Sequence, residues 1–214
     1  VLRAPSGSGT GAAAQHSQSL ESWFAHVPGL KVVLPSSPAD AKGFLLSALD
    51  DPNPVIVLEH KLLYKTSGHV PEEMYRTPIG VSNTVREGSD LTIVATGVMV
   101  SRAVEASAQL SSEGVEASVI DVRTLSPLDM GPINDSVAKT GRLMLVQEAP
   151  KHVGFMAEVA ARVSEGPAIY SLTEPVMRLC GMDVPIPYAP QLEKSVVPQL
   201  NDIVEGARQI MRGV

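Results

Sequence analysis

The sequence predicts an α/β fold in which a mostly parallel sheet is covered by helices on both faces. Short apolar segments alternate along the chain with amphipathic segments of helical period, as in βαβ units. Two segments, residues 37–40 and 126–129, combine a serine, a proline and an acid, which is a typical helix start. The chain has 214 residues, enough for one large domain or two small ones.

The first third of the chain predicts two helices between short strands. Leu20, Trp23, Phe24 and Val27 lie at helical spacing and predict the buried face of a short helix. The expected elements are the end of a strand at residues 1–5, that helix at 20–27, a strand at 30–34, a helix at 38–49 and a strand at 55–58.

Residues 60–88 are polar and have no sustained period, so we interpret them as a linker or crossover between domains. Regular alternation resumes after Asp90. The expected strands are 91–96, 118–123, 143–147 and 176–180, and the expected helices are 100–110, 126–140, 155–163 and 200–211.

Composition excludes several classes of protein. The net charge is −6 without a block of lysines or arginines, so a nucleic acid is not an expected partner. No apolar run approaches the roughly 18 residues typical of a membrane span. The single cysteine, Cys180, cannot form an internal disulfide and indicates a reducing compartment; in an apolar strand it is expected to be a core residue.

His16 is the first candidate for chemistry. It precedes the expected helix, whose start is near Ser17 or Ser19, and the positive end of a helix disfavours an imidazolium, so a neutral imidazole able to give or take a proton is one interpretation. The other is a histidine that only satisfies a hydrogen bond at a helix start. No Cys, His or acidic residue stands near it at metal-ligand spacing, which disfavours zinc, and the chain has no Gly-x-Ser-x-Gly motif of a hydrolase.

Residues 7–12, GSGTGA, match the permissive form of the dinucleotide-binding fingerprint. Such a site needs a preceding strand, an immediate helix and an acid about 20 residues further on. Pro5 interrupts the approach and no acid lies near residue 27, so a flexible glycine loop is the better interpretation. His152, which follows an expected strand, is likewise interpreted as part of a surface loop.

Residues 48–53 form a second candidate site. The end of a helix leaves carbonyl groups unpaired, and Asp50, Asp51 and Asn53 add oxygen ligands that suit a hard cation. An Asp-Pro pair is also a common way to end a helix, so both interpretations stay open.

The sequence resembles the beta subunit of the thiamine-diphosphate-dependent decarboxylase component of 2-oxo acid dehydrogenase complexes, from about Gly11 to the C-terminus. The resemblance is carried by ordered segments, namely QHSQ (15–18), AHVPGLKVV (25–33), DAKG (40–43), NPV (53–55), LEH (58–60), DVRTLSP (121–127), EAP (148–150) and PIPY (185–188).

The resemblance implies a domain organisation. Residues 1–65 would be the back half of a pyrimidine-binding domain, residues 66–88 a linker, and residues 89–214 a transketolase C-terminal-like domain. The first half of the pyrimidine-binding domain would lie outside this sequence, together with the glutamate that activates the cofactor and the aromatic residue that stacks on it. The chain is therefore expected to be a fragment that is inactive by itself.

The resemblance also implies a chemistry and a set of site residues. The activity would be oxidative decarboxylation of a 2-oxo acid, pyruvate first, with acyl transfer to lipoamide. His16 matches the active-site histidine near the thiazolium ring, and Ala48, Asp51 and Asn53 match a monovalent-cation site for K⁺. Thiamine diphosphate and Mg²⁺ would be held largely by the alpha chain and the part of the beta chain outside this sequence, so no cofactor-binding residue is assigned here.

The implied partners are the alpha subunit, a second beta subunit and the lipoyl-bearing acyltransferase core, in bacterial cytoplasm or the mitochondrial matrix, without nucleic acid or membrane. The modest negative charge agrees with a basic binding module on the core. Two alternatives share these motifs: the beta subunit of an acetoin dehydrogenase, and an interaction module that keeps the fold without catalysis.

Overall fold

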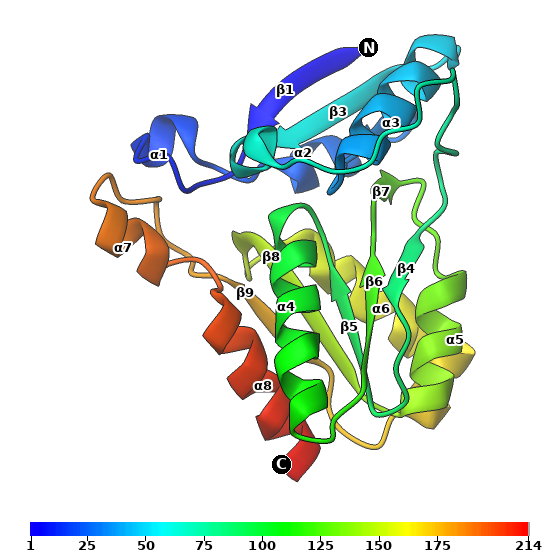
Figure 1. The fold of residues 1–214 in the computed structure, drawn as a ribbon, viewed down its shortest axis with the longest axis vertical. Coiled ribbons are helices and arrows are strands. Elements are labelled where there is room, and N and C mark those ends of the chain that lie inside the picture. Colours follow the sequence, from blue (N-terminus) through cyan, green and yellow to red (C-terminus); the bar gives the residue numbers. More distant parts are fainter. Residues whose placement is uncertain (214) are drawn as a thin grey trace.

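Two sheets, one above the other in Figure 1, organise the chain, of which the computed structural model describes residues 1–213. The first sheet has the strand order β1-β3-β2-β7 and the second has the order β4-β6-β5-β8-β9. All but two of these strands run parallel to their neighbours, the exceptions being the edge strands β7 and β4. The predicted α/β class, with mostly parallel sheets, is confirmed.

The first sheet is built mainly from the N-terminal third of the chain. Its strands are β1 (Leu2–Ser6), β2 (Lys31–Val33), β3 (Val55–His60) and β7 (Thr124–Ser126), and its helices are α1 (Ala13–His16), α2 (Glu21–Ala25), α3 (Pro38–Asp50) and the 3-10 helix η1 (Lys61–Lys65). Helix α3 begins as predicted, because the Ser37 side chain accepts a hydrogen bond from the Asp40 amide and Pro38 occupies the first turn. Phe44 then packs under the sheet against Val33, Val55 and Val57.

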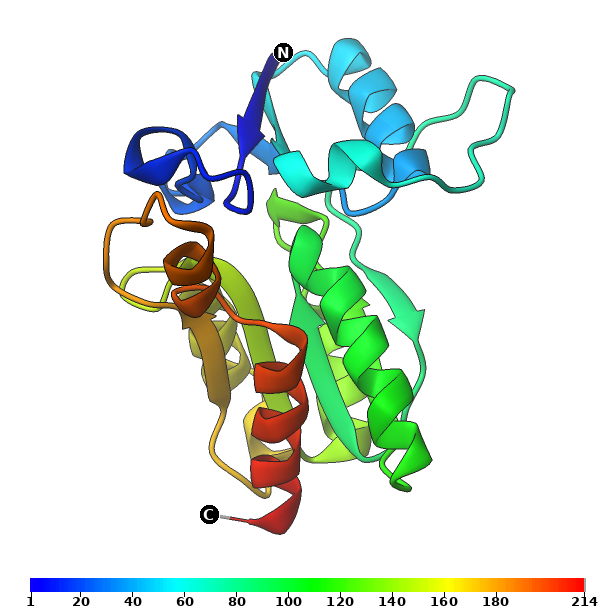
Figure 2. The same cartoon turned by 60° about the vertical axis from the view of Figure 1, so that its left-hand side comes forward.

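The second sheet holds the larger core and carries helices on both faces (Figure 2). Its strands are β4 (Asn83–Arg86), β5 (Leu91–Ala95), β6 (Ala117–Asp121), β8 (Leu143–Pro150) and β9 (Met177–Gly181). Helices α4 (Val98–Ser112) and α8 (Leu200–Arg212) pack on one face, and α5 (Gly131–Thr140) and α6 (Phe155–Glu165) pack on the other. The 3-10 helix η2 (Pro167–Ser171) lies between α6 and β9, and α7 (Pro190–Ser195) lies between β9 and α8. No helix within residues 1–213 combines the length and apolar character needed to cross a membrane.

The two sheets are joined by the chain crossing between β6 and β7 and by a common core. The strand predicted at 118–123 is β6, which ends at Asp121, and the chain then passes into β7, which pairs with β2 of the first sheet. At this crossing Arg123 donates a 2.7 Å hydrogen bond to the buried carboxylate of Asp40, and its carbonyl accepts from the Leu34 amide at 2.8 Å. Apolar residues of both sheets, such as Val32 and Ile120, belong to the same buried cluster.

Two other sequence predictions need correction here. The helix expected from Ser126 begins at Gly131, with Pro132 in its first turn, because Ser126 is taken by β7 and its hydroxyl donates to the Leu30 carbonyl. The segment 60–88 is not a plain linker, because it holds η1 and β4. Strand β4 pairs with β6, so the second sheet begins before residue 89, while the proposed domain limits 1–65, 66–88 and 89–214 stay a prediction.

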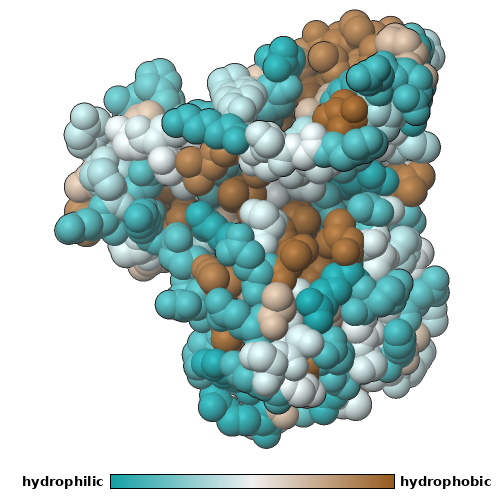
Figure 3. All heavy atoms as spheres, viewed as in Figure 1, coloured by the Kyte–Doolittle hydropathy of each residue, from teal (hydrophilic) through white to brown (hydrophobic). Residues whose placement is uncertain are grey.

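The expected buried face of the helix near residue 20 is wrong. Only Phe24 packs against the core, whereas Trp23 is 71% exposed and Leu20 and Val27 are also exposed. The spacing of these residues is helical, but α2 is only Glu21–Ala25, so Leu20 and Val27 lie outside it. Figure 3 shows hydrophobic side chains at the surface in the region where the two halves of the molecule meet.

Candidate functional site

The glycine loop that follows β1 is occupied by carboxylates of the same chain. The amide of Ser8 donates to Glu148 Oε1 at 2.6 Å, and the amides of Gly9 and Gly11 donate to the two oxygens of Glu193 at 2.8 and 3.1 Å. A phosphate-binding loop needs these backbone donors for its ligand. The interpretation that this is not a dinucleotide site agrees with the geometry, because the amides that would bind a phosphate already donate to Glu148 and Glu193.

One step of that sequence argument is wrong. Pro5 does not interrupt a strand, because it lies within β1 in register with Glu59 of β3. Proline is tolerated here because β1 is the edge strand of its sheet, where half of the backbone donors have no partner strand. The strand required by the fingerprint is therefore present, and it is the filled loop that rules the site out.

Glu148 is the centre of a buried polar cluster between the sheets. Its Oε2 lies 3.0 Å from Nε2 of His60, which ends β3, and both side chains are more than 90% buried. The Leu62 amide donates to His60 Nδ1, so the other ring nitrogen, Nε2, carries the hydrogen that Glu148 accepts. Ser19 adds a hydroxyl donor to Glu148 Oε1 at 3.2 Å.

Charge in this cluster is unevenly distributed between two acids. Burial by itself would raise the pKa of Glu148, but the hydrogen bond and charge of His60 and the Ser8 amide hold that pKa below its ordinary value. Glu21, at the start of α2, is only 3% exposed and lines the same small cavity. Burial, with a smaller contribution from the charge of Glu148, raises the pKa of Glu21 to about 7.

His16 is close in sequence to Ser19 and Glu21 of this cluster, but its side chain faces away from the interior. It is the last residue of α1, a helix of one turn, and its side chain is exposed. His16 precedes α2, as predicted, but it is five residues away from the start of α2 and is itself the end of α1. The argument that a helix N-terminus disfavours its imidazolium is therefore wrong. Its imidazole makes no hydrogen bond with any residue in 1–213, while its backbone carbonyl accepts from the Lys61 ammonium.

The candidate cation residues lie together at the end of α3. Asp51 caps the helix, and Pro52 has no N–H to donate to the Ala48 carbonyl, which leaves that carbonyl without its helical partner. The Asp51 carboxylate accepts from the Lys31 ammonium and from both the amide and the side chain of Asn53. These hydrogen bonds, that of Lys31 first, lower the pKa of Asp51 to about 2.

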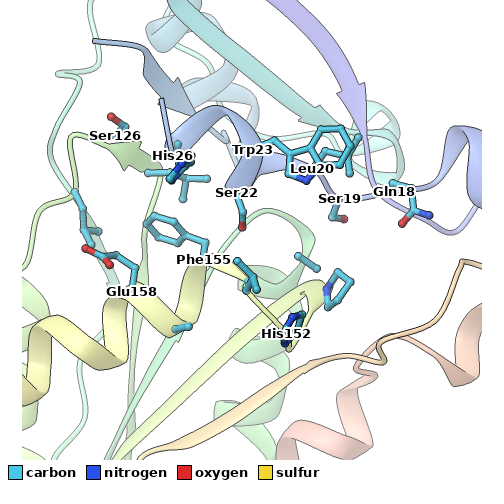
Figure 4. A pocket seen from close by; sticks show the side chains of 18 of the residues that line it. Gln18, Ser19, Leu20, Ser22, Trp23, His26, Ser126, His152, Phe155 and Glu158 are labelled. Atoms are coloured by element: carbon cyan, nitrogen blue, oxygen red, sulfur yellow. The ribbon is translucent and has the colours of Figure 1, made fainter. Parts of the chain in front are cut away.

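An open groove of about 1060 Å³ lies between α2 and the second sheet (Figure 4). Trp23 and His26 come from α2 on one side, and His152, Phe155 and Glu158 come from the β8–α6 connection and α6 on the other. The groove is thus made by both halves of the molecule. His152 belongs to an exposed loop, as expected, and its backbone amide donates to Asp183.

Cys180 is not the core residue that the sequence predicts. It is half-buried, because β9 is the last strand of the second sheet and lacks a neighbour on one side. Burial nevertheless raises the pKa of its thiol to about 11, which keeps it protonated near neutral pH.

Sequence reasoning missed the four buried acids that organise this region, which are Glu21, Asp121, Glu148 and Glu193. A signal existed for two of them, since Asp121 ends β6 and Glu148 lies near the end of β8, where parallel sheets gather functional side chains. Asp121 accepts from the Ser36 hydroxyl, and burial raises its pKa to about 7. No comparable signal exists for Glu193, which sits on a helix of six residues.

Comparison with protein families gives two matches. The pyrimidine-binding domain of transketolase matches residues 1–67, and the C-terminal domain of transketolase matches residues 80–203, which is more than half of the chain.

Curated relatives match nearly the whole chain. The beta subunit of acetoin:2,6-dichlorophenolindophenol oxidoreductase from Cupriavidus necator is 46% identical over 213 residues, covering 100% of this chain and 63% of that protein. The mitochondrial beta subunit of the human pyruvate dehydrogenase E1 component is 45% identical, covering 95% and 58%. The corresponding subunit from Rhizobium meliloti is 42% identical, covering 98% and 46%. The chain thus spans about half to two thirds of the length of these relatives.

Among solved structures, a split-gene transketolase described as an inactive beta4 tetramer has a TM-score of 0.80 and 25% sequence identity. The match covers 98% of this chain and 66% of that one. The likeness extends across both sheets, so their relative arrangement is shared with that protein.

Glu21→Gln tests the charge distribution between the sheets. A folded-state pKa of about 7, against an ordinary 4.5, means that the unfolded chain releases this proton first as pH rises. The free energy of unfolding should therefore fall between about pH 4.5 and pH 7, by on the order of 3 kcal/mol. The glutamine variant should lose this decrease.

Urea denaturation at pH 5, 6, 7 and 8 measures the effect. Glu113→Gln is the control, because Glu113 forms an exposed ion pair with Arg208. Parallel pH profiles for the wild type and Glu21→Gln would show that Glu21 titrates as an ordinary carboxyl.

Proposed function

The chain belongs to the transketolase family, and on that premise we propose that it is part of the beta subunit of a 2-oxo acid dehydrogenase, in its thiamine-diphosphate-dependent decarboxylase component. The proposed reaction is oxidative decarboxylation of a 2-oxo acid, pyruvate first, with transfer of the acyl group to lipoamide. The observation that carries the proposal is the 42–46% identity with such subunits across both matched domains, together with an exposed histidine, His16, whose imidazole has no partner within residues 1–213.

His16 is the proposed catalytic residue. Thiamine diphosphate, when bound, would supply the nucleophilic carbon and the electron sink that decarboxylation of a 2-oxo acid requires. The His16 imidazole is exposed and has no partner within residues 1–213, so both ring nitrogens are available to a cofactor or substrate held by another chain. Its proposed task is to move protons during decarboxylation and acyl transfer.

The proposed partners are an alpha subunit, a second beta subunit and a lipoyl-bearing acyltransferase core, in bacterial cytoplasm or the mitochondrial matrix. Exposed apolar side chains in and beside α2 support an interaction surface, namely Leu20, Trp23 and Val27. Mg²⁺ and the main contacts to thiamine diphosphate are assigned to the alpha chain and to beta-subunit residues outside this sequence.

Acetoin is the second candidate substrate class. The relative from Cupriavidus necator, whose name includes acetoin, is 46% identical over 213 residues. The pyruvate dehydrogenase subunits are similarly close, at 42% and 45%. The two candidates share the proposed role of His16 and differ only in the substrate.

His16→Ala tests the proposed activity. In the assembled enzyme that contains this chain, turnover with pyruvate should fall by about 100-fold or more, because a positioned acid–base group contributes at least that much. Turnover is measured as lipoamide-dependent reduction of NAD⁺ in the reconstituted complex. Acetoin and branched-chain 2-oxo acids are tested separately as alternative substrates. His69→Ala, which alters another exposed histidine, is the control. Wild-type turnover of His16→Ala would return His16 to a structural role.

The 214-residue chain by itself should neither turn over pyruvate nor bind thiamine diphosphate tightly. Isothermal titration of the purified chain with thiamine diphosphate and Mg²⁺ should give a dissociation constant weaker than about 100 µM, because few of the cofactor's binding groups are present. A micromolar constant would contradict the assignment of the main cofactor contacts to other parts of the enzyme.

We further propose that Ala48, Asp51 and Asn53 bind a monovalent cation, K⁺. The ionised Asp51 carboxylate supports this, as does the Ala48 carbonyl, to which Pro52 cannot donate. The Lys31 ammonium pairs with the same carboxylate and must move aside when the cation binds.

In the assembled enzyme, 100 mM KCl should raise the melting temperature by about 5 °C over choline chloride of equal ionic strength. Asp51→Asn should abolish the difference, whereas Asp50→Asn, at an exposed neighbour paired with Arg76, should keep it. Equal melting temperatures for the wild type in both salts would exclude the site.

A further inference from the structure

His16 lies in a loop, residues 7–18, whose two ends are joined by a hydrogen bond and whose backbone is bound by residues from other parts of the chain. The Gly7 amide donates to the Gln18 carbonyl at 3.4 Å, which joins the two ends of residues 7–18. Between these ends the only regular element is the single turn of α1. The position of His16 therefore depends on what the rest of the protein does to this loop.

Two carboxylates from the second sheet provide most of the contacts that fix the loop. Glu148 accepts from Ser8 near one end of the loop and from Ser19 just beyond the other end. Glu193 accepts from Gly9 and Gly11, one amide on each oxygen, in the centre of the loop. Both acids are far away in the sequence, and their side chains are 7% and 3% exposed. Backbone donors bound to ionised acceptors make strong hydrogen bonds.

The loop backbone is shaped to reach these carboxylates. Gly7, Gly9 and Gly11 have φ angles of +87°, +95° and +65°, which side-chain-bearing residues rarely adopt. A Cβ atom on Gly7 would lie 2.1 Å from His60 Nε2, the ring nitrogen that donates to Glu148. The glycines thus let the loop approach the acids and their histidine partner.

We propose that Glu193, with Glu148, is a positioning residue that holds the His16 loop in its working conformation. This inference rests on the proposed function only for the role of His16, whereas the restraint on the loop is independent of it. Glu193 does not touch the imidazole. It fixes the two glycine amides ahead of α1, and the single turn of α1, which begins two residues after Gly11, ends on His16.

Glu193→Gln is the test variant. A glutamine offers one acceptor oxygen in place of two and turns an NH₂ group toward one of the glycine amides. In the assembled enzyme, we expect hydrogen–deuterium exchange of residues 7–12 to increase about tenfold, because one charge-assisted hydrogen bond is lost and the other weakened. Turnover with pyruvate should fall about tenfold while KM is unchanged.

A double variant separates positioning from general destabilisation. If Glu193 acts through His16, the turnover of His16→Ala/Glu193→Gln should equal that of His16→Ala alone. Glu193→Asp, which keeps both acceptor oxygens on a shorter side chain, should recover part of the exchange protection and part of the turnover. Glu113→Gln, remote from the loop, is the matched control and should change neither quantity.

The outcomes are distinguishable from failure of the proposed function. Unchanged exchange in Glu193→Gln would overturn the restraint, whatever His16 does. Increased exchange with unchanged turnover, or an equal loss of turnover in the presence and absence of His16, would overturn the positioning role. If His16→Ala keeps full turnover, the function proposed for His16 fails while the exchange result still decides whether Glu193 holds the loop. Should Glu193→Gln not fold by circular dichroism, the same exchange and turnover measurements on Glu193→Asp decide.

Discussion

A pair of buried carboxylates joins the two halves of this molecule, and much of the observed arrangement follows from them. Glu148 and Glu193 belong to the second sheet and its connections, yet most of their hydrogen-bond donors belong to the first. A carboxylate taken out of water requires several good donors, and the glycine loop and His60 supply them. The position of the loop and the hydrogen on Nε2 of His60 depend on this demand, and the charge of Glu148 adds to the effect of burial in raising the pKa of Glu21.

Local pattern was sufficient to predict most of the regular structure. Helix α3 begins with Ser37, Pro38 and Asp40 as the sequence indicates, because all of the capping interactions lie within one turn. The strands of the second sheet are nearly continuous apolar runs, since a parallel sheet covered on both faces excludes polar side chains. Such features need no knowledge of distant residues.

The failures share a dependence on distant partners. Ser126 has the composition of a helix cap, but β2 recruits it into a strand of the other sheet. Trp23 has the spacing of a core residue, but nothing in residues 1–213 covers it fully. Glu193 accepts from glycines more than 180 residues away, and no window of the sequence contains both. The role of His16 stays a prediction that rests on resemblance, since the local helix argument for it was wrong.

The glycine loop shows that the function of a phosphate-binding motif depends on what its backbone amides donate to. Its spacing fits a phosphate cradle and a strand does precede it, so only the destination of its amides separates the two functions. Those amides point at acids of the same chain, in a joint that apolar side chains could have made at lower desolvation cost. A carboxylate accepts hydrogen bonds from preferred directions, whereas apolar side chains can shift against one another and stay in contact. The two carboxylates therefore contribute more to fixing one conformation of the loop than to the free energy of unfolding. A strict conformation is useful where the loop carries a side chain that must meet a reacting atom, and His16 is the side chain that this loop carries outward.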